Sequence, residues 1–279
     1  MKADPISPNG RPITIRPITA EELDRVVLRC WPDRATLERL FAAQSTIGFA
    51  AWHGSRCVAE LHGYRVQLPG GTNEHWPPWN NWWSDDVRQV VAHLSGPAWC
   101  HACIHVGRTL KSAHQETLGL VYRFARQHEW DVDRARSALN ALDGVDLGRN
   151  QIAALIQELQ ASGQMQFQDI ETRYQGRGIG TALCRGSIQW AREHGYAWVL
   201  AMGAPKGLYA YAQFSGRLPW TTYARLGFQP LPLPSRDGLP AWTQGPAPPE
   251  VVAEAPVALQ TVRPPAPLHE RLMVLNLHP

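Results

Sequence analysis

Residues 174–184 combine three closely spaced glycines with the start of an amphipathic helix, an arrangement that suits the binding of a pyrophosphate. The stretch reads Tyr-Gln-Gly-Arg-Gly-Ile-Gly-Thr-Ala-Leu-Cys. Gly176, Gly178 and Gly180 allow a ligand to approach the backbone closely, and the unpaired amides at the start of the helix face an anion. The order of residues matches neither a nucleotide P-loop nor the G-x-G-x-x-G motif. An ordinary tight turn before a helix would show the same glycines.

A second group of residues with chemical potential lies in Trp99–Val106, which reads Trp-Cys-His-Ala-Cys-Ile-His-Val and is predicted to be a strand. Side chains alternate along a strand, so His101, Cys103 and His105 are expected on one face. Two imidazoles on one face could relay a proton from an ammonium group through water, because imidazoles titrate near neutral pH. They could equally be half-buried polar groups with satisfied hydrogen bonds.

Other residues could act as the base, and the cysteines and histidines of this strand could have other roles. Asp169 and Glu171 are rival bases because they precede the glycine-rich turn, although Glu171 could be a solvated loop residue. The cysteines and histidines of Trp99–Val106 divide between two faces and lack the loop that wraps a tetrahedral zinc ion, so no metal is expected. Nothing in the sequence marks the Cys103 thiol as an activated, acyl-accepting nucleophile.

The elements after the glycine-rich turn are predicted from local patterns. Residues 181–194 have the spacing of an amphipathic helix, and Gly195 is placed to end it. Ala197–Met202 is an apolar run typical of a buried strand. Thr222–Phe228 reads as a helix end followed by a strand, and Arg271–Leu277 predicts the final strand.

Gln175-x-x-Gly178-x-Gly180 resembles the Q/R-x-x-G-x-G/A signature of the GNAT superfamily of N-acetyltransferases, and the elements just described follow it in that family's order. The resemblance covers residues 13–66 and 165–229, extends less closely to the end of the chain, and leaves out residues 69–164. It implies an α/β fold with a central mixed, mostly antiparallel sheet flanked by helices, and a helical insertion before the acetyl-CoA-binding motif. It also implies an acyl-CoA-dependent N-acyltransferase that acetylates a primary amine of a small molecule by direct attack.

The same resemblance implies roles for individual residues. Tyr223 corresponds to the family's tyrosine that hydrogen-bonds the coenzyme sulfur and acts as general acid; a phenol is protonated at neutral pH and can donate. Tyr223 could instead be an aromatic packing residue. The pantetheine arm would lie along the strand at Ile170, and the pyrophosphate would bind the turn, where Arg177 adds charge. The implied coenzyme-binding residues are Ile170, Gln175, Gly176, Arg177, Gly178, Ile179, Gly180 and Thr181.

Aromatic residues could select the acceptor. Trp79, Trp82 and Trp83 would favour a flat apolar or cationic amine through stacking and cation–π contacts. Trp220 lies in a loop before Tyr223, where loops often set specificity. A packed loop that covers the inserted helices explains the tryptophan cluster equally well.

The chain divides into three predicted regions. Residues 13–106 form the N-terminal half of the acetyltransferase fold with a tryptophan-rich loop at 69–84, residues 107–164 form a helical insertion, and residues 165–279 form the acetyl-CoA-binding half with a proline-rich loop at 231–267. The strand Met165–Glu171 is expected to feed the glycine-rich turn, with Trp99–Val106 as its first half or its neighbour. Further predicted elements are strands at Ile13–Ile18, Ile47–His53 and Cys57–Val66, a helix from Ala20 with Thr19 and Glu22 as a capping box, a helix at Asp33–Ala43, and insertion helices at Thr117–Gln127, Asp131–Leu142 and Gln151–Leu159.

Composition narrows the class of protein. The chain has 279 residues, 44% of them hydrophobic, which is ample for a core. A formal charge of +3 with no run of five or more like charges gives no support to a nucleic-acid or membrane partner. No opening signal peptide is apparent, and five cysteines suit a reducing compartment, so a cytoplasmic location is expected. A homodimer stays open, as do two alternatives: a non-catalytic acyl-CoA sensor or interaction module, and a protein or peptide amine acetyltransferase.

Overall fold

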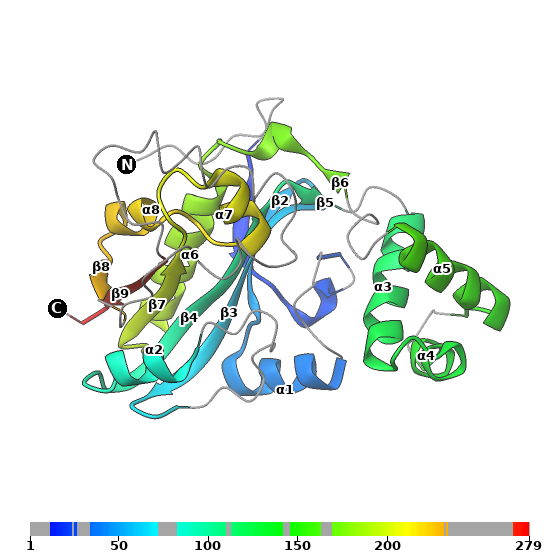
Figure 1. The fold of residues 1–279 in the computed structure, drawn as a ribbon, viewed down its shortest axis with the longest axis horizontal. Helices are drawn as coiled ribbons and strands as arrows, with labels where there is room; N and C mark the ends of the chain where they lie inside the picture. Colours follow the sequence, from blue (N-terminus) through cyan, green and yellow to red (C-terminus); the bar gives the residue numbers. More distant parts are fainter. Residues whose placement is uncertain are drawn as a thin grey trace. The chain divides into compact units, whose positions relative to one another are not determined.

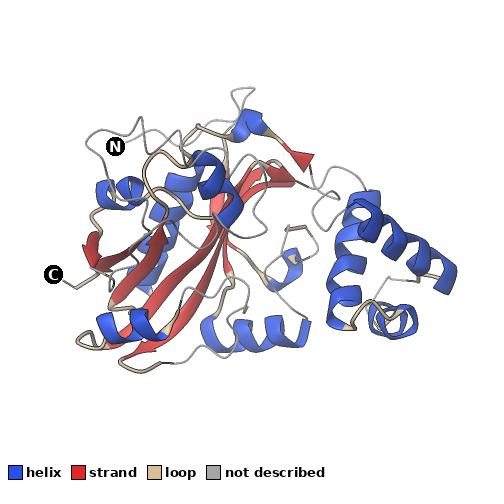
Figure 2. Ribbon diagram, in the orientation of Figure 1, coloured by secondary structure: helices blue, strands red, loops and turns tan. Residues whose placement is uncertain are grey.

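Seven strands form one mixed sheet with the order β1-β2-β3-β4-β7-β9-β8, and helices flank it (Figures 1 and 2). The β4–β7 pair is parallel, whereas the β1–β2, β7–β9 and β8–β9 pairs are antiparallel, so the predicted mixed, mostly antiparallel sheet is confirmed. The chain forms two compact units, residues 1–60 with 106–179 and residues 61–105 with 180–279. The computed structural model describes residues 12–23, 25–26, 34–71, 83–109, 113–141, 146–162, 169–231, 233 and 270–278.

The first unit begins with a short strand and a hairpin that match the prediction. β1 (Thr14–Pro17) pairs with β2 (Gly48–His53), and Gly54, with φ +63°, turns the chain into β3 (Arg56–Leu68). That φ lies in the left-handed region, which glycine adopts without strain. The helix predicted from Ala20 is a single 3₁₀ turn, η1 (Ala20–Glu22), with the expected capping box, and α1 covers Arg34–Gln44.

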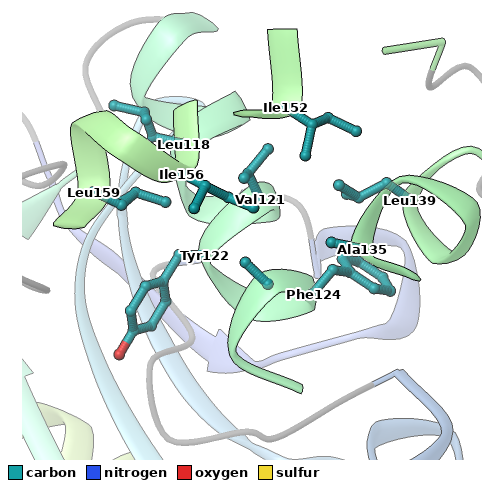
Figure 3. Packing of buried hydrophobic residues seen from close by; sticks show 10 residues of the cluster. Leu118, Val121, Tyr122, Phe124, Ala135, Leu139, Ile152, Ile156 and Leu159 are labelled. Atoms are coloured by element: carbon teal, nitrogen blue, oxygen red, sulfur yellow. The ribbon is translucent and has the colours of Figure 1, made fainter. Parts of the chain in front are cut away.

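Three helices of the first unit confirm the predicted helical segments of the insertion. They are α3 (Ala113–Gln127), α4 (Val132–Leu139) and α5 (Arg149–Ser162). Their apolar faces point toward one another around a shared core (Figure 3). The Asp131 carboxylate starts α4 by accepting a 2.9 Å hydrogen bond from the Arg134 amide. The domain boundaries at residues 107 and 164 stay predictions. The buried core residues are Leu118, Val121, Tyr122, Phe124, Ala125, Ala135, Leu139, Ile152, Ile156 and Leu159.

The segment before the glycine-rich turn differs from the prediction. After β4 the chain forms β5 (Arg108–Thr109), which pairs antiparallel with β6 (Asp169–Ile170) in a separate two-stranded sheet. A 3₁₀ helix, η3 (Thr172–Tyr174), then separates β6 from the turn. The expectation that Met165–Glu171 is one strand running directly into the turn was therefore wrong for its described part; residues 163–168 lie outside the described ranges. Long-range pairing with β5, which local patterns do not report, decides where β6 lies.

The second unit holds the parallel strand pair and the helices that follow it. β4 (Gly96–Val106) pairs with β7 (Trp198–Gly203), which pairs on its other edge with β9 (Arg271–Asn276), and β8 (Gln229–Leu231) completes the edge. The predicted strands and the helix that ends at Gly195 are confirmed within a few residues. The helices are α2 (Asp85–Val90), α6 (Ile179–Glu193), α7 (Tyr209–Ser215) and α8 (Trp220–Arg225).

Two predicted loops fall largely outside the described residues. Residues 72–82 of the tryptophan-rich loop and residues 234–267 of the proline-rich loop are not described. Within the described ranges, no helix combines the length and the apolar character needed to cross a membrane.

Candidate active site

The glycine-rich turn presents open backbone at the start of α6. Gly176 and Gly178 have φ values of +69° and +78°, in the left-handed region that strains any residue with a Cβ atom. A Cβ atom added at either position would meet no atom within 4 Å. These glycines are therefore required by backbone conformation, and the space in front of them is free for a ligand.

The amides of this turn are available for an anion. Among the described residues, no backbone carbonyl accepts a hydrogen bond from the six consecutive amides of residues 176–181, whereas the Gln175 amide before them donates to the Thr172 carbonyl at 2.9 Å. The last of these amides belong to the first turn of α6, where helix amides are unpaired and the helix dipole is positive. The arrangement fits a pyrophosphate, and Arg177 is exposed beside it.

Buried ionic and polar contacts hold the approach to the turn in place. Glu171 is 7% exposed, and its carboxylate forms ion pairs with Arg56 of β3 and with Arg173. His53 Nδ1 lies 2.8 Å from the Tyr174 hydroxyl. Glu171 is thus neither the solvated residue nor the free base considered from the sequence, because two guanidinium groups engage its carboxylate.

Asp169 and Ile170 lie in β6, away from the seven-stranded sheet. Their backbones pair with Thr109 and Arg108 respectively. The strand edge expected to hold the pantetheine arm is therefore a two-residue segment and not part of a long strand. Nothing is described of the Asp169 side chain, so its role as a base stays a prediction.

One face of β4 contacts the helices of the second unit, as strand alternation predicts. Ser187 of α6 accepts a 2.8 Å hydrogen bond from the Trp99 indole and lies 3.1 Å from His101 Nε2. The Cys184 thiol, also on α6, lies 3.9 Å from His101 Nδ1, and the Tyr223 ring of α8 lies 6.2 Å from the His101 ring. His101 is therefore enclosed by two helices.

Burial changes the proton chemistry of His101. The side chain is 2% exposed, and burial lowers its pKa to about 3, because a charged imidazole loses its hydration there. The near-neutral pKa expected from the sequence is therefore wrong for His101. At neutral pH this imidazole is uncharged and serves as a hydrogen-bonding group, not as a proton acceptor for an ammonium ion.

Tyr223 keeps its proton under all ordinary conditions. Its side chain is 2% exposed and packs against Phe228, with ring centroids 5.2 Å apart. Burial, and then the neighbouring Cys184 thiol, raise the pKa of Tyr223 well above its usual value. The phenol is thus a hydrogen-bond donor within the same enclosed face as His101.

Further along the strand, β4 contacts a residue that the sequence analysis missed. His62 of β3 places its Nδ1 atom 3.1 Å from the Cys103 sulfur, and its ring lies edge-on to the His105 ring with centroids 6.1 Å apart. His62 is fully buried, whereas His105 is half-buried. No local motif could have identified His62, because its partner lies 41 residues away on another strand.

The segment 216–220 bridges the ends of the parallel strands. The register of β4 with β7 ends at His101 and Ala201. Beyond it, the Ile104 amide of β4 donates to the Gly216 carbonyl at 2.5 Å, while Ala204, just after β7, donates to Leu218 and accepts from the Trp220 amide. Gly216 has φ +65°, and a Cβ atom there would lie 2.9 Å from Cys103 Cβ, so only glycine allows this close approach.

The tryptophans predicted to select the acceptor differ in their surroundings. Trp83 is buried, and its indole N–H donates to the Gly71 carbonyl at 2.9 Å, so it packs inward and presents no stacking surface. The Trp220 ring is covered by the Arg271 guanidinium at 4.3 Å. Trp79 and Trp82 lie outside the described residues.

Helix α6 connects the open turn with the polar face of β4. Its first residues carry the unpaired amides, and its later turns carry Cys184 and Ser187, which face His101. A helix rises about 1.5 Å per residue, so Ser187 lies about 10 Å along the axis from Gly180. Across the part of the chain that is described, no group of three or more potential ligands could hold a metal ion.

Comparisons with known proteins reveal only distant likeness. No protein-family model matches the chain, and no curated protein matches it. Among solved structures, the chain is similar to a polyamine N-acetyltransferase of Drosophila melanogaster (15% identity, TM-score 0.33) and to arylalkylamine N-acetyltransferase 2 of Aedes aegypti (12% identity, TM-score 0.36). A third is an agmatine N-acetyltransferase (16% identity, TM-score 0.35); each match covers 95% of this chain and 99% of the other. Likeness this distant leaves function to be argued from the site itself.

Proposed function

We propose that this protein is an acyl-CoA-dependent N-acyltransferase that transfers the acetyl group of acetyl-CoA to a primary amine of a small molecule by direct attack. One observation carries the proposal. Among the described residues, the six consecutive amides of residues 176–181 donate to no backbone carbonyl, and they follow Gln175 in the Gln175-x-x-Gly178-x-Gly180 sequence that resembles the acetyltransferase signature. A turn of this kind suits a pyrophosphate diester such as that of coenzyme A.

The residues at hand fit the acyl donor, which is one of the two substrates and supplies an activated acetyl group as a thioester. The backbone amides of residues 176–181 would hold its pyrophosphate, and the exposed Arg177 adds positive charge. The open space in front of Gly176 and Gly178 supports this fit, because side chains there would occupy the place of the phosphates.

Two side chains of the β4 face would move protons. Tyr223, which retains its proton because of its raised pKa, would donate a hydrogen bond or a proton to the departing sulfur. His105 would accept the proton of the amine, since it is half-buried while His101 is sealed and has a pKa of about 3. Direct attack needs no further group, provided that the amine is held close to the thioester carbon.

The proposal is tested by following thiol release from acetyl-CoA with the purified protein and a panel of small primary amines. We expect release that depends on both the protein and an amine, with the acetylated amine as product. Binding of coenzyme A without turnover of any amine would favour the sensor alternative, and turnover with peptide amines alone would favour a protein acceptor. Failure to bind coenzyme A at all would contradict the proposal.

A further inference from the structure

Cys103 has the surroundings of an activated nucleophile. Its sulfur lies 3.1 Å from His62 Nδ1, and the two side chains are 2% and 0% exposed. A thiol within hydrogen-bond reach of an imidazole can pass its proton to that base, which leaves the thiolate as the reactive species. The sequence alone supplied no activating neighbour for this thiol; β3 supplies one.

For two other buried thiols of the second unit, no described imidazole lies as close as His62 lies to Cys103. Cys100 is on the opposite face of β4, and burial raises its pKa well above the usual value. Cys184 lies 3.9 Å from His101 Nδ1, farther than the 3.1 Å that separates the Cys103 sulfur from His62 Nδ1. The pairing with His62 therefore distinguishes Cys103.

The residue after Cys103 already binds a carbonyl oxygen. The Ile104 amide donates to the Gly216 carbonyl at 2.5 Å, and Gly216 lies against Cys103. The amide is thus oriented so that, with Gly216 displaced, it would donate to the oxygen of a thioester carbonyl as negative charge develops.

We propose that Cys103, with His62 as its base, is a second acyl acceptor of this site. In the absence of an amine, Cys103 takes the acetyl group from acetyl-CoA and later releases it to water or to an amine. The inference rests on the proposed function for the identity of the acyl donor. Nucleophile, base and oxyanion donor come from Cys103, His62 and the Ile104 amide, and Gly216 must move aside for the donor to enter.

The step is balanced without any further reactant. His62 Nδ1 takes the proton of the Cys103 thiol as the sulfur bonds to the acetyl carbon, and the bond between that carbon and the coenzyme sulfur breaks. The proton then passes from His62 to the departing thiolate, which leaves an acetyl thioester on Cys103. Attack by water or an amine, with His62 taking and returning a proton, restores the Cys103 thiol. Nothing is oxidised or reduced.

The test incubates the protein with acetyl-CoA in the absence of amine and measures its intact mass and its modified peptides. We expect one acetyl group, mapped to Cys103 and removed by hydroxylamine as thioesters are. Cys103→Ala should carry none, whereas Cys100→Ala, a buried cysteine on the same strand, should be acetylated like the wild type. His62→Gln should slow the labelling at least tenfold, with His62→Asn as the substitute if the glutamine variant does not fold.

Absence of an acetyl group on Cys103 of the wild-type protein would overturn this inference, and so would equal labelling rates in the wild type and the folded His62 variant. The proposed function would survive that result if amines were still acetylated, because direct attack does not use Cys103. Failure of coenzyme A to bind would instead remove the proposed function itself.

Discussion

Two interiors of this molecule are equally closed to solvent and yet built from different chemistry. The core of α3, α4 and α5 is lined by Leu, Ile, Val, Ala and aromatic side chains from three facing helices (Figure 3). The buried face of β4 instead encloses His62, His101, Cys103 and Tyr223. Apolar burial stabilises a fold by about 25 cal/mol per Å², whereas buried polar groups cost free energy unless they are hydrogen-bonded. The helical core therefore stabilises the fold mainly through apolar burial, whereas the interior beside β4 also requires hydrogen-bond partners for its polar groups.

Hydrogen-bonding partners offset the free-energy cost of burying the polar side chains beside β4. Ser187 takes the Trp99 indole proton and contacts His101, and Cys103 contacts His62. The helical core is apolar apart from the Tyr122 hydroxyl. A change in the helical core should therefore alter stability alone, while a change on the β4 face should alter reactivity.

The largest difference between the two interiors is expected when one phenol is removed from each. Tyr223→Phe should lower turnover by about 10² to 10⁴, the range typical of a lost general acid, with coenzyme affinity nearly unchanged. Tyr122→Phe, in the core of the three helices, is the matched control and should leave turnover at the wild-type rate. Steady-state kinetics on both folded variants makes the comparison. Equal turnover by Tyr223→Phe and the wild type would mean that the proton comes from another group.

The pH dependence of the free energy of unfolding should also distinguish the two interiors, with a smaller effect than the loss of turnover. Unfolded His101 takes up a proton near its ordinary pKa of about 6.5, whereas in the folded protein its pKa is about 3. The unfolded state therefore binds more protons between these values, so the free energy of unfolding falls as the pH drops below about 6.5. For this one group the loss from pH 7 to pH 5 is about 2 kcal/mol.

Denaturant unfolding at the two pH values checks this expectation. His101→Gln should lose that part of the pH dependence, whereas Leu139→Ala, in the helical core, should destabilise the protein by the same amount at both. If His101→Gln retained the full wild-type pH dependence, the imidazole would not be the buried neutral group described here.

Local patterns predicted the elements whose signals are local. The helix expected at 181–194 begins at Ile179 and its glycine stop, Gly195, has φ +74°, because amphipathic spacing and a left-handed cap are both visible in sequence. That His101, Cys103 and His105 share one face, as alternation indicates, stays a prediction. The glycine-rich turn was found for the same reason, since positive φ values demand glycine.

Features that depend on long-range pairing escaped prediction. The position of β6 is decided by β5, which the three inserted helices separate from it in sequence, and the imidazole beside Cys103 comes from β3. The sequence also did not reveal which side chains are buried. Burial lowers the pKa of His101 to about 3, and the Trp83 indole donates inward to the Gly71 carbonyl, although histidine and tryptophan serve catalysis or binding in other proteins. Residue type and spacing predict the possible chemistry of a side chain, whereas its burial and its contacts in the fold determine whether that chemistry is available.

The central claim is that the turn before α6 binds the pyrophosphate of coenzyme A, and the two ends of that helix allow a direct test. Gly178 and Gly195 flank α6 with φ values of +78° and +74°, and at both an added Cβ atom meets nothing within 4 Å. Alanine at either position therefore carries similar backbone strain, but only at Gly178 would it enter the space of the phosphates. Calorimetric titration should show coenzyme A affinity at least tenfold weaker for Gly178→Ala, about 1.4 kcal/mol, and unchanged for Gly195→Ala. Equal affinities in the two folded variants would contradict the account.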